Sequence, residues 1–227
     1  MRIRHIFFTA ALLVATELSA QNKKELVDSL EVLREKIEFN PDSLDLRLKK
    51  ASLNIELGQW EYAKYEYDTV LKYAPNNLAA LFYRAYVNMK MRRYTFSRSD
   101  YNRLLTIVPG NYEARLGLAV LNQREGRYTE ALDILNRMVS DFPDSAAVYA
   151  ARADIEKGRQ MYEMAELDYA EAMKRDAGNT DYILMRADAL ICLGRKREAE
   201  VHLNTLVSKG IPRGSLKDYY KRCRKKK

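Results

Sequence analysis

Hydrophobic and polar residues alternate along most of this chain with the spacing of paired amphipathic helices. Residues 78–91 and 94–108 each carry apolar side chains on one face, and a Pro-Asn-Asn turn at 75–77 precedes the first stretch. Pro109 ends the second stretch, because proline lacks a backbone N–H and disfavours helical geometry in the residue before it. The same spacing recurs over residues 23–39, where the apolar positions are Leu26, Leu30, Leu33 and Ile37. The pattern therefore predicts an all-α fold.

The pattern repeats every 34 residues. Proline recurs on this spacing at Pro41, Pro75, Pro109 and Pro143. One column of small residues is Ala51, Ala85, Ala119, Ala153 and Ala187, and a second is Ala63, Ser97, Ala131, Ala165 and Ala199. An aromatic column is Trp60, Tyr94, Tyr128 and Tyr162, and a large apolar column is Tyr67, Tyr101, Leu135, Tyr169 and Leu203. A fixed period of this length is typical of stacked helical repeats.

Packing explains the residue types in these columns. A small residue lets two helices cross closely, and a larger side chain there would overpack the crossing at a cost of about 1–3 kcal/mol. The aromatic side chain that opens each second helix is expected to fill the space between neighbouring units. Glycine at positions 58, 126 and 194 supplies the left-handed turn between the two helices of a unit. One unit cannot bury such a face alone, so the core should run continuously through a stack.

These columns resemble the tetratricopeptide repeat (TPR) family. The small residue of the first helix matches in all five units, and the alanine of the second helix matches in four, with Ser97 in the other. The expected first-helix tryptophan is instead Arg47, Leu81, Arg115, Tyr149 and Ile183. The expected tyrosine later in that helix is instead Asn54, Asn88, Asn122, Glu156 and Leu190. The resemblance covers residues 44–211 and implies a right-handed α-solenoid of five helix-turn-helix units.

The resemblance also divides the chain. The expected units are 44–77, 78–111, 112–145, 146–179 and 180–211. Residues 21–43 hold an N-terminal capping helix, and residues 212–227 hold a short closing helix and a basic tail. Residues 1–20 have a basic start, an apolar run of about ten residues and small residues near Ala20, which is the order found in a secretory signal peptide. An amphipathic or buried N-terminal helix and an uncleaved anchor are the alternatives.

Charge is concentrated at the carboxyl end. The chain has a net charge of +8, yet residues 213–227 carry eight basic side chains and one acid, so residues 21–212 balance. The predicted basic tail is Lys221, Arg222, Arg224, Lys225, Lys226 and Lys227. A body-wide nucleic-acid footprint is therefore not expected, although the tail could contact phosphate, anionic lipid or an acidic partner. The alternative is a solvated terminus that aids solubility.

By the resemblance, the first helices line a concave groove that holds segments of partner proteins. The groove positions carried over onto this chain are Leu48, Ile55, Phe82, Tyr86, Met89, Leu116, Val120, Asp154 and Asp188. They predict an apolar groove that becomes acidic at its carboxyl-terminal end and suits a segment with hydrophobic anchors followed by basic residues. Two alternatives stay open: these side chains could be buried between neighbouring first helices, or the basic tail could fold back onto Asp154 and Asp188.

Catalytic and metal-binding patterns are missing from the sequence. No nucleophile elbow, zincin helix or phosphate-binding loop motif occurs, and the chain has only two histidines and two cysteines. Basic neighbours should favour the thiolate of Cys223, and an internal bond between Cys223 and Cys192 is open. We therefore expect neither an enzyme nor a cofactor.

Together these features predict an exported protein–protein interaction scaffold of a bacterial periplasm that holds a partner segment in its groove. The partners expected are proteins or peptides, with no nucleic acid and no membrane-spanning segment in the mature chain. The alternative is an accessory subunit of an envelope or secretion assembly, tethered through its basic tail to anionic lipid or polymer. The sequence does not name the partner, the pathway or the oligomeric state.

Overall fold

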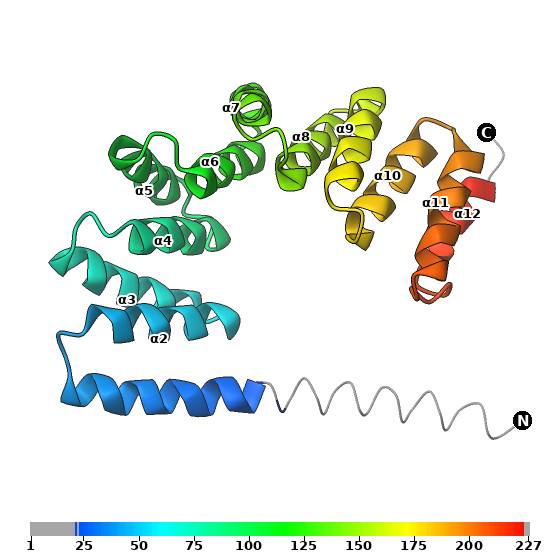
Figure 1. Ribbon diagram of the computed structural model, residues 1–227. Helices are drawn as coiled ribbons and strands as arrows, with labels where there is room; N and C mark the ends of the chain where they lie inside the picture. The colour runs from blue at the N-terminus through cyan, green and yellow to red at the C-terminus, as the bar shows by residue number, and fades with distance from the viewer. Residues whose placement is uncertain (1–20, 22, 225–227) are drawn as a thin grey trace, which may run out of the picture. The chain divides into compact units, whose positions relative to one another are not determined.

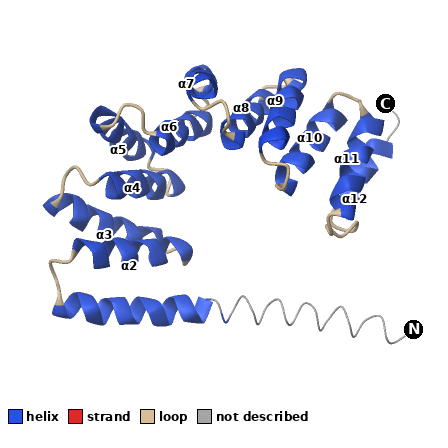
Figure 2. Ribbon diagram, in the orientation of Figure 1, coloured by secondary structure: helices blue, strands red, loops and turns tan. Residues whose placement is uncertain are grey.

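The computed structural model describes residue 21 and residues 23–224. Within this part of the chain every regular element is a helix, and the helices are joined by short loops (Figure 2). The predicted all-α fold is confirmed. The predicted signal peptide at 1–20 and Lys225, Lys226 and Lys227 lie outside the described residues.

The helices recur on the 34-residue period of the sequence (Figure 1). A helix over residues 23–39 comes first. The first helices of the pairs are α2 (Leu44–Glu56), α4 (Leu78–Lys90), α6 (Tyr112–Arg124), α8 (Ala146–Gly158) and α10 (Thr180–Cys192). The second helices are α3 (Trp60–Tyr73), α5 (Tyr94–Ile107), α7 (Tyr128–Asp141), α9 (Tyr162–Arg175) and α11 (Lys196–Ser208). The short helix α12 (Lys217–Arg224) follows.

The turn between the helices of a pair has the same geometry whether or not it contains glycine. Gly58, Gly126 and Gly194 have positive φ, and so do Arg92 and Gln160, which occupy the same repeat position. In the α4–α5 turn the N–H of Arg93 donates to the Asn88 carbonyl and the N–H of Arg92 donates to the Met89 carbonyl. This is the Schellman arrangement, which needs a left-handed residue and satisfies the last carbonyls of the helix.

The chain divides into two compact units, the described residues up to Ala114 and those from Arg115. In the first unit α2 packs on α3, α3 on α4 and α4 on α5. In the second unit consecutive helices pack in the same way from α7 to α12. Each helix therefore contacts mainly its neighbours in sequence, as in an α-solenoid.

Both columns of small residues lie at the centre of this packing. All ten of their members have no exposed surface, and the large apolar column from Tyr67 to Leu203 is equally buried. The aromatic column differs from the expectation at one position, because Tyr128 keeps 41% of its surface exposed. The sequence therefore identified the small and large apolar side chains that lie where the helices cross. Tyr128, in contrast, is only partly buried between units.

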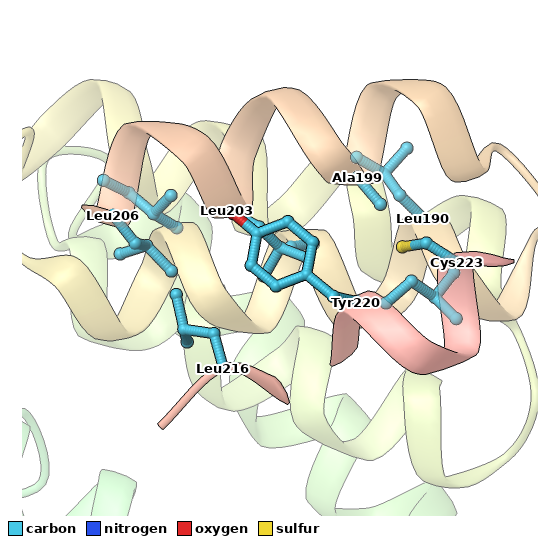
Figure 3. Close-up of a cluster of buried hydrophobic side chains, with 10 residues drawn as sticks. Leu190, Ala199, Leu203, Leu206, Leu216, Tyr220 and Cys223 are labelled. Carbon is cyan, nitrogen blue, oxygen red and sulfur yellow. The ribbon is translucent and has the colours of Figure 1, made fainter. Parts of the chain in front are cut away.

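Helix α12 covers the end of the second unit. Leu216, Tyr220 and Cys223 pack with Leu190, Ala199, Leu203 and Leu206 from α10 and α11 in one buried cluster (Figure 3). The Tyr220 hydroxyl donates to Asn204 Oδ1 at 2.7 Å, which satisfies the polar end of the buried ring. Most of the apolar face that α10 and α11 would otherwise expose is therefore covered by α12.

Candidate functional site

In the first unit the predicted groove residues come from α2 and α4. Leu48 and Ile55 on α2, and Phe82 and Tyr86 on α4, are half-buried and each keeps some surface. Met89 is different, because only 6% of its surface is exposed. The available apolar surface on these first helices is therefore smaller than the sequence suggested, and Met89 contributes little to it.

Two of these side chains, Phe82 and Tyr86, make contacts with other aromatic rings. The Phe82 ring lies 6.0 Å from that of Tyr101 on α5 and 5.1 Å from that of Tyr83. The Tyr86 ring meets the Trp60 indole edge-on at 6.3 Å, and the Lys90 ammonium lies 5.1 Å from the centre of the Tyr86 ring. A cation held over an aromatic face stabilises its orientation. The first unit thus presents a set of rings whose geometry is already fixed.

In the second unit the two predicted acidic groove residues are already bonded within the chain. Leu116 and Val120 on α6 are half-buried. Asp154 accepts a hydrogen bond from the Tyr169 hydroxyl, and Asp188 accepts one from Lys157 Nζ at 2.9 Å and another from Arg222. Although burial opposes it, these two cationic partners hold the pKa of Asp188 below its ordinary value. Asp188 is therefore already neutralised by residues of the chain itself.

Arg222 lies exactly one repeat after Asp188 in the same column, so α12 continues the row of first helices. Of the predicted basic tail, Arg222 forms an ion pair with Asp188, whereas Asp154 accepts its hydrogen bond from Tyr169. Lys221 and Arg224 are exposed on the same helix. The short closing helix expected within residues 212–227 is α12, and it also carries the tail residues Lys221, Arg222 and Arg224.

Buried ion pairs join the two helices of most pairs. Lys50 bonds Glu66, Arg84 bonds Asp100 through two nitrogens, and Arg152 bonds Asp168 through two nitrogens, always between residues 16 apart. Arg84 also reaches Asp68 on the preceding second helix at 2.8 Å. The corresponding residues of the 112–145 segment are Leu118 and Ile134. Such arginines link three helices at once, which the hydrophobic pattern did not reveal.

Two clefts in the first unit lie beside these ion pairs and recur one repeat apart. The Asn54 cleft, of about 460 Å³, is lined by Arg34, Lys50, Asn54, Glu61, Tyr62, Tyr65 and Glu66. The Asn88 cleft, of about 430 Å³, is lined by Lys64, Asp68, Arg84, Asn88, Arg93, Phe96, Ser99 and Asp100. None of the nine predicted groove residues lines either cleft. The sequence feature that could have located these two clefts is the column of asparagines, at the position where the TPR resemblance expects tyrosine.

A third cleft, of about 510 Å³, lies at the carboxyl end. Its lining residues are Arg213, Gly214, Lys217, Tyr220, Lys221 and Arg224. The Arg213 guanidinium lies 4.3 Å from the centre of the Tyr220 ring. Among the ion pairs of residues 23–224, none involves any of these four cationic side chains. We call this the cationic cleft; it offers concentrated positive charge to an anion.

The cysteines behave differently from the expectation. Cys192 is exposed, Cys223 is buried, and both are free thiols. Burial, helped by the charge of Glu200, raises the pKa of the Cys223 thiol and outweighs the neighbouring Arg222. The prediction that basic neighbours favour a Cys223 thiolate is therefore wrong, because the side chain points into the cluster beneath α12 and away from solvent.

Residues 23–224 contain neither a metal-binding cluster nor a helix suited to crossing a membrane. No group of three or more histidine, cysteine or acidic side chains in that part is arranged to hold a metal ion. None of the helices described there combines the length and the apolar character that a bilayer crossing needs.

Comparison with known proteins identifies the repeat. Two tetratricopeptide-repeat family models match residues 48–111 and 88–155. A tetratricopeptide-repeat protein from Parabacteroides merdae has 23% sequence identity and a TM-score of 0.74, over 95% of this chain and 84% of its own. TTC0263, a thermophilic TPR protein of Thermus thermophilus, has 16% identity and a TM-score of 0.65, over 80% of this chain and 98% of its own. No curated protein sequence matches the chain.

A further solved structure is YrrB, described as a TPR protein with an unusual peptide-binding site. It has 17% identity and a TM-score of 0.55, over 79% of this chain and 92% of its own. At these identities the structural likenesses support the fold alone. The two family models show tetratricopeptide repeats over residues 48–155, and the structural likenesses together with the packing of consecutive helix pairs show that the rest of the described chain has the same fold.

Proposed function

We propose that this chain is an exported, non-catalytic scaffold that holds a segment of a partner protein against its first helices. The observation that carries the proposal is the face of α2 and α4, where Leu48, Ile55, Phe82 and Tyr86 keep apolar surface and the Phe82 and Tyr86 rings contact neighbouring rings. A preformed apolar surface with aromatic anchors binds polypeptide segments at a low ordering cost. The description of YrrB as a peptide-binding TPR protein is consistent with this use of the fold.

The partner chemistry differs from the one the sequence suggested. Asp154 and Asp188 are engaged by Tyr169, Lys157 and Arg222, so an incoming basic residue would have to displace partners already in place. Hydrophobic or aromatic anchors therefore matter more for the proposed segment than a basic end. Export rests on the leader-like pattern of residues 1–20 alone, and a bacterial periplasm remains the compartment we propose.

Affinity capture tests the proposal. The full chain and its Phe82→Glu, Tyr86→Glu double variant are used to capture proteins from an envelope extract, and the captured proteins are identified by mass spectrometry. We expect the wild-type chain to retain a specific partner that the variant loses, because two buried charges cannot be accommodated in an apolar contact. Circular dichroism confirms that the variant folds. Equal capture by the two folded proteins would remove the first-helix face as the binding surface.

The cationic cleft favours a second candidate function, tethering to an anionic lipid or polymer. Arg213, Lys217, Lys221 and Arg224 could together neutralise several phosphate groups. Binding of the full chain to vesicles containing phosphatidylglycerol should then exceed binding to phosphatidylcholine vesicles and be lost at about 0.5 M salt, because screening acts on exposed charges. Binding that is equal for both vesicles, or that persists in salt, removes this candidate.

A further inference from the structure

The first and last helices of the described chain carry opposite charges on their exposed faces. In the helix over residues 23–39, one exposed face carries four acidic side chains, Asp28, Glu31, Glu35 and Glu38. At about 100° per residue these four fall within one quarter of the helix circumference, away from the side that buries Leu30. Lys24 lies on the same face, one turn before the first acid. We call the four acids the acidic stripe.

The cationic cleft carries the opposite charge with the same spacing. Three of its lining residues, Lys217, Lys221 and Arg224, are exposed along one face of α12. They follow one another at intervals of four and three residues, as do the last three residues of the acidic stripe. At a rise of about 1.5 Å per residue, both sets span about 10 Å along their helices. Asp218, the one acid of α12, lies to one side of the cations. The two charge patterns are therefore complementary in length and in spacing.

Most of these charges are not neutralised within the described part of the molecule. Within residues 23–224, no ion pair involves Asp28, Glu35 or Glu38, and none involves a cation of the cationic cleft. Glu31 pairs with Arg34 on its own helix, but both side chains are exposed, and such pairs contribute little to stability. Both surfaces therefore keep most of their charge for a partner.

Exposed apolar side chains flank the acidic stripe. Phe39 is 85% exposed and Val32 is 49% exposed, and both lie beside the stripe on the helix circumference. In the cationic cleft, the lysine stems and the Tyr220 ring supply carbon atoms that these side chains can contact. Docking of the two surfaces would cover apolar area in addition to pairing charges, which favours a protein occupant over a small ion.

We propose that the acidic stripe of one copy of this chain docks into the cationic cleft of a second copy. Because the two surfaces lie on the first and the last described helices, the contact is heterologous, and each copy can use one surface with each of two neighbours. Repeated contacts of this kind build a chain of copies, or a ring if the rotation closes. The inference goes beyond the proposed function, since it uses no residue of the face on α2 and α4.

The cationic cleft is also the surface of the tethering candidate, and the acidic stripe separates the two uses. An anionic lipid or polymer would pair with the cations alone and would leave the stripe without a complement. A second copy supplies a stripe whose acids have the spacing of the cations on α12. The matched spacing therefore favours a second copy. Self-association requires both surfaces, whereas tethering requires only the cleft.

Sedimentation velocity of the full chain tests the proposal. We expect the average mass to rise with protein concentration at about 50 mM salt and to fall towards that of a single copy at about 0.5 M salt, because salt screens pairs of exposed charges. An average mass that is independent of concentration in low salt, or the same in both salts, would overturn the proposal. Binding to phosphatidylglycerol vesicles by a chain that does not self-associate would assign the cleft to the lipid instead.

Matched neutral variants identify the two surfaces. Glu35→Gln with Glu38→Gln weakens the acidic stripe, and Lys217→Gln with Lys221→Gln weakens the cleft. All four side chains are exposed, so the fold should be kept, and circular dichroism checks this. Each double variant should associate about tenfold less tightly than the wild-type chain, because two exposed charge pairs are lost. Both variants keep residues 1–20, so association through that segment would be the same in each.

A mixture of the two double variants provides the sharpest outcome. Each variant retains one intact surface, so the mixture should form pairs containing one copy of each and nothing larger. The control, Asp133→Asn with Glu163→Gln, removes two exposed acids from α7 and α9 and should associate as the wild-type chain does. A mixture that associates no better than either variant alone, or a control that loses association to the same extent, would contradict the proposed contact.

Discussion

Asn88 in the first unit and Glu156 in the second occupy the same repeat position, 68 residues apart. Both are at least 97% buried, and each has one side-chain oxygen without a hydrogen-bond partner. Both stand one helical turn after an arginine that is bonded to an aspartate, Arg84 with Asp100 and Arg152 with Asp168. The amide stays neutral at every accessible pH, whereas the carboxyl can ionise. In both units the polar side chain at this position therefore has an oxygen without a partner, and only in the second unit is that side chain titratable.

Ionisation at this position is opposed by its surroundings. Burial raises the pKa of Glu156 to about 7, with the negative charge of Asp168 adding to the effect and Arg152 opposing it. The two units thus share one architecture and differ in their expected response to pH. Three sets of substitutions test this comparison, in order of decreasing expected effect.

The largest effect is expected from the arginines that both units share. Arg84→Met removes the cation that holds Asp100, whose side chain is 6% exposed, and should destabilise the protein by about 3–5 kcal/mol because a buried charge is left unpaired. Arg93→Met, which breaks the exposed pair with Glu61, should cost less than about 1 kcal/mol. Urea unfolding monitored by circular dichroism measures both, and similar losses for the two variants would contradict the role assigned to Arg84.

The second effect depends on pH. Because the pKa of Glu156 is higher in the folded chain than in the unfolded one, folding is favoured most below about pH 4.5 and is progressively disfavoured as pH rises through 7. Glu156→Gln should therefore stabilise the protein by about 2–3 kcal/mol at pH 8 and have little effect at pH 5. Urea unfolding at the two pH values provides the measurement.

The matched control introduces an ionisable carboxyl at the equivalent position of the first unit. Asn88→Asp puts a carboxyl where the amide is, and it should make stability fall between pH 5 and pH 8 in a protein that also carries Glu156→Gln. If Glu156→Gln has the same effect at both pH values, the difference between the two units does not arise from ionisation at this position.

The smallest effect concerns the turns. Arg92 has φ of 60° and Gln160 has φ of 63°, a region that costs a side-chain-bearing residue about 1 kcal/mol or more. Gln160→Gly and Arg92→Gly should each stabilise the protein by about 0.5–1 kcal/mol, whereas Gly126→Ala at the equivalent position should destabilise it. Thermal unfolding compares the three, and a loss of stability in both glycine variants would show that these turns are not strained.

The sequence predicted those features of the fold that depend on local periodicity. The alanine columns are fully buried, the helices begin on the 34-residue period, and Gly58, Gly126 and Gly194 adopt positive φ. Each follows from steric rules acting within one helix pair. Arg92 and Gln160 escaped prediction because the Schellman hydrogen bonds impose the same geometry on residues that do not favour it.

The candidate sites were less predictable because they depend on contacts between helices. The burial of Met89, the Arg222–Asp188 ion pair and the inward orientation of Cys223 follow from how α4 and α12 pack, which residue types alone do not specify. The clefts beside Asn54 and Asn88 had a signal in the sequence, the asparagines at a position where the resemblance expects tyrosine, but their volume and their exposed rims required the structure.

The central claim is that a partner segment binds the first-helix face of α2 and α4. Its most direct test is the affinity of a captured partner, measured by titration calorimetry, for Tyr86→Glu and for Val201→Glu, a matched change of an exposed apolar residue on the second helix α11. We predict at least a tenfold loss of affinity for folded Tyr86→Glu and none for Val201→Glu. Unchanged affinity in Tyr86→Glu, or an equal loss in both variants, would contradict the claim.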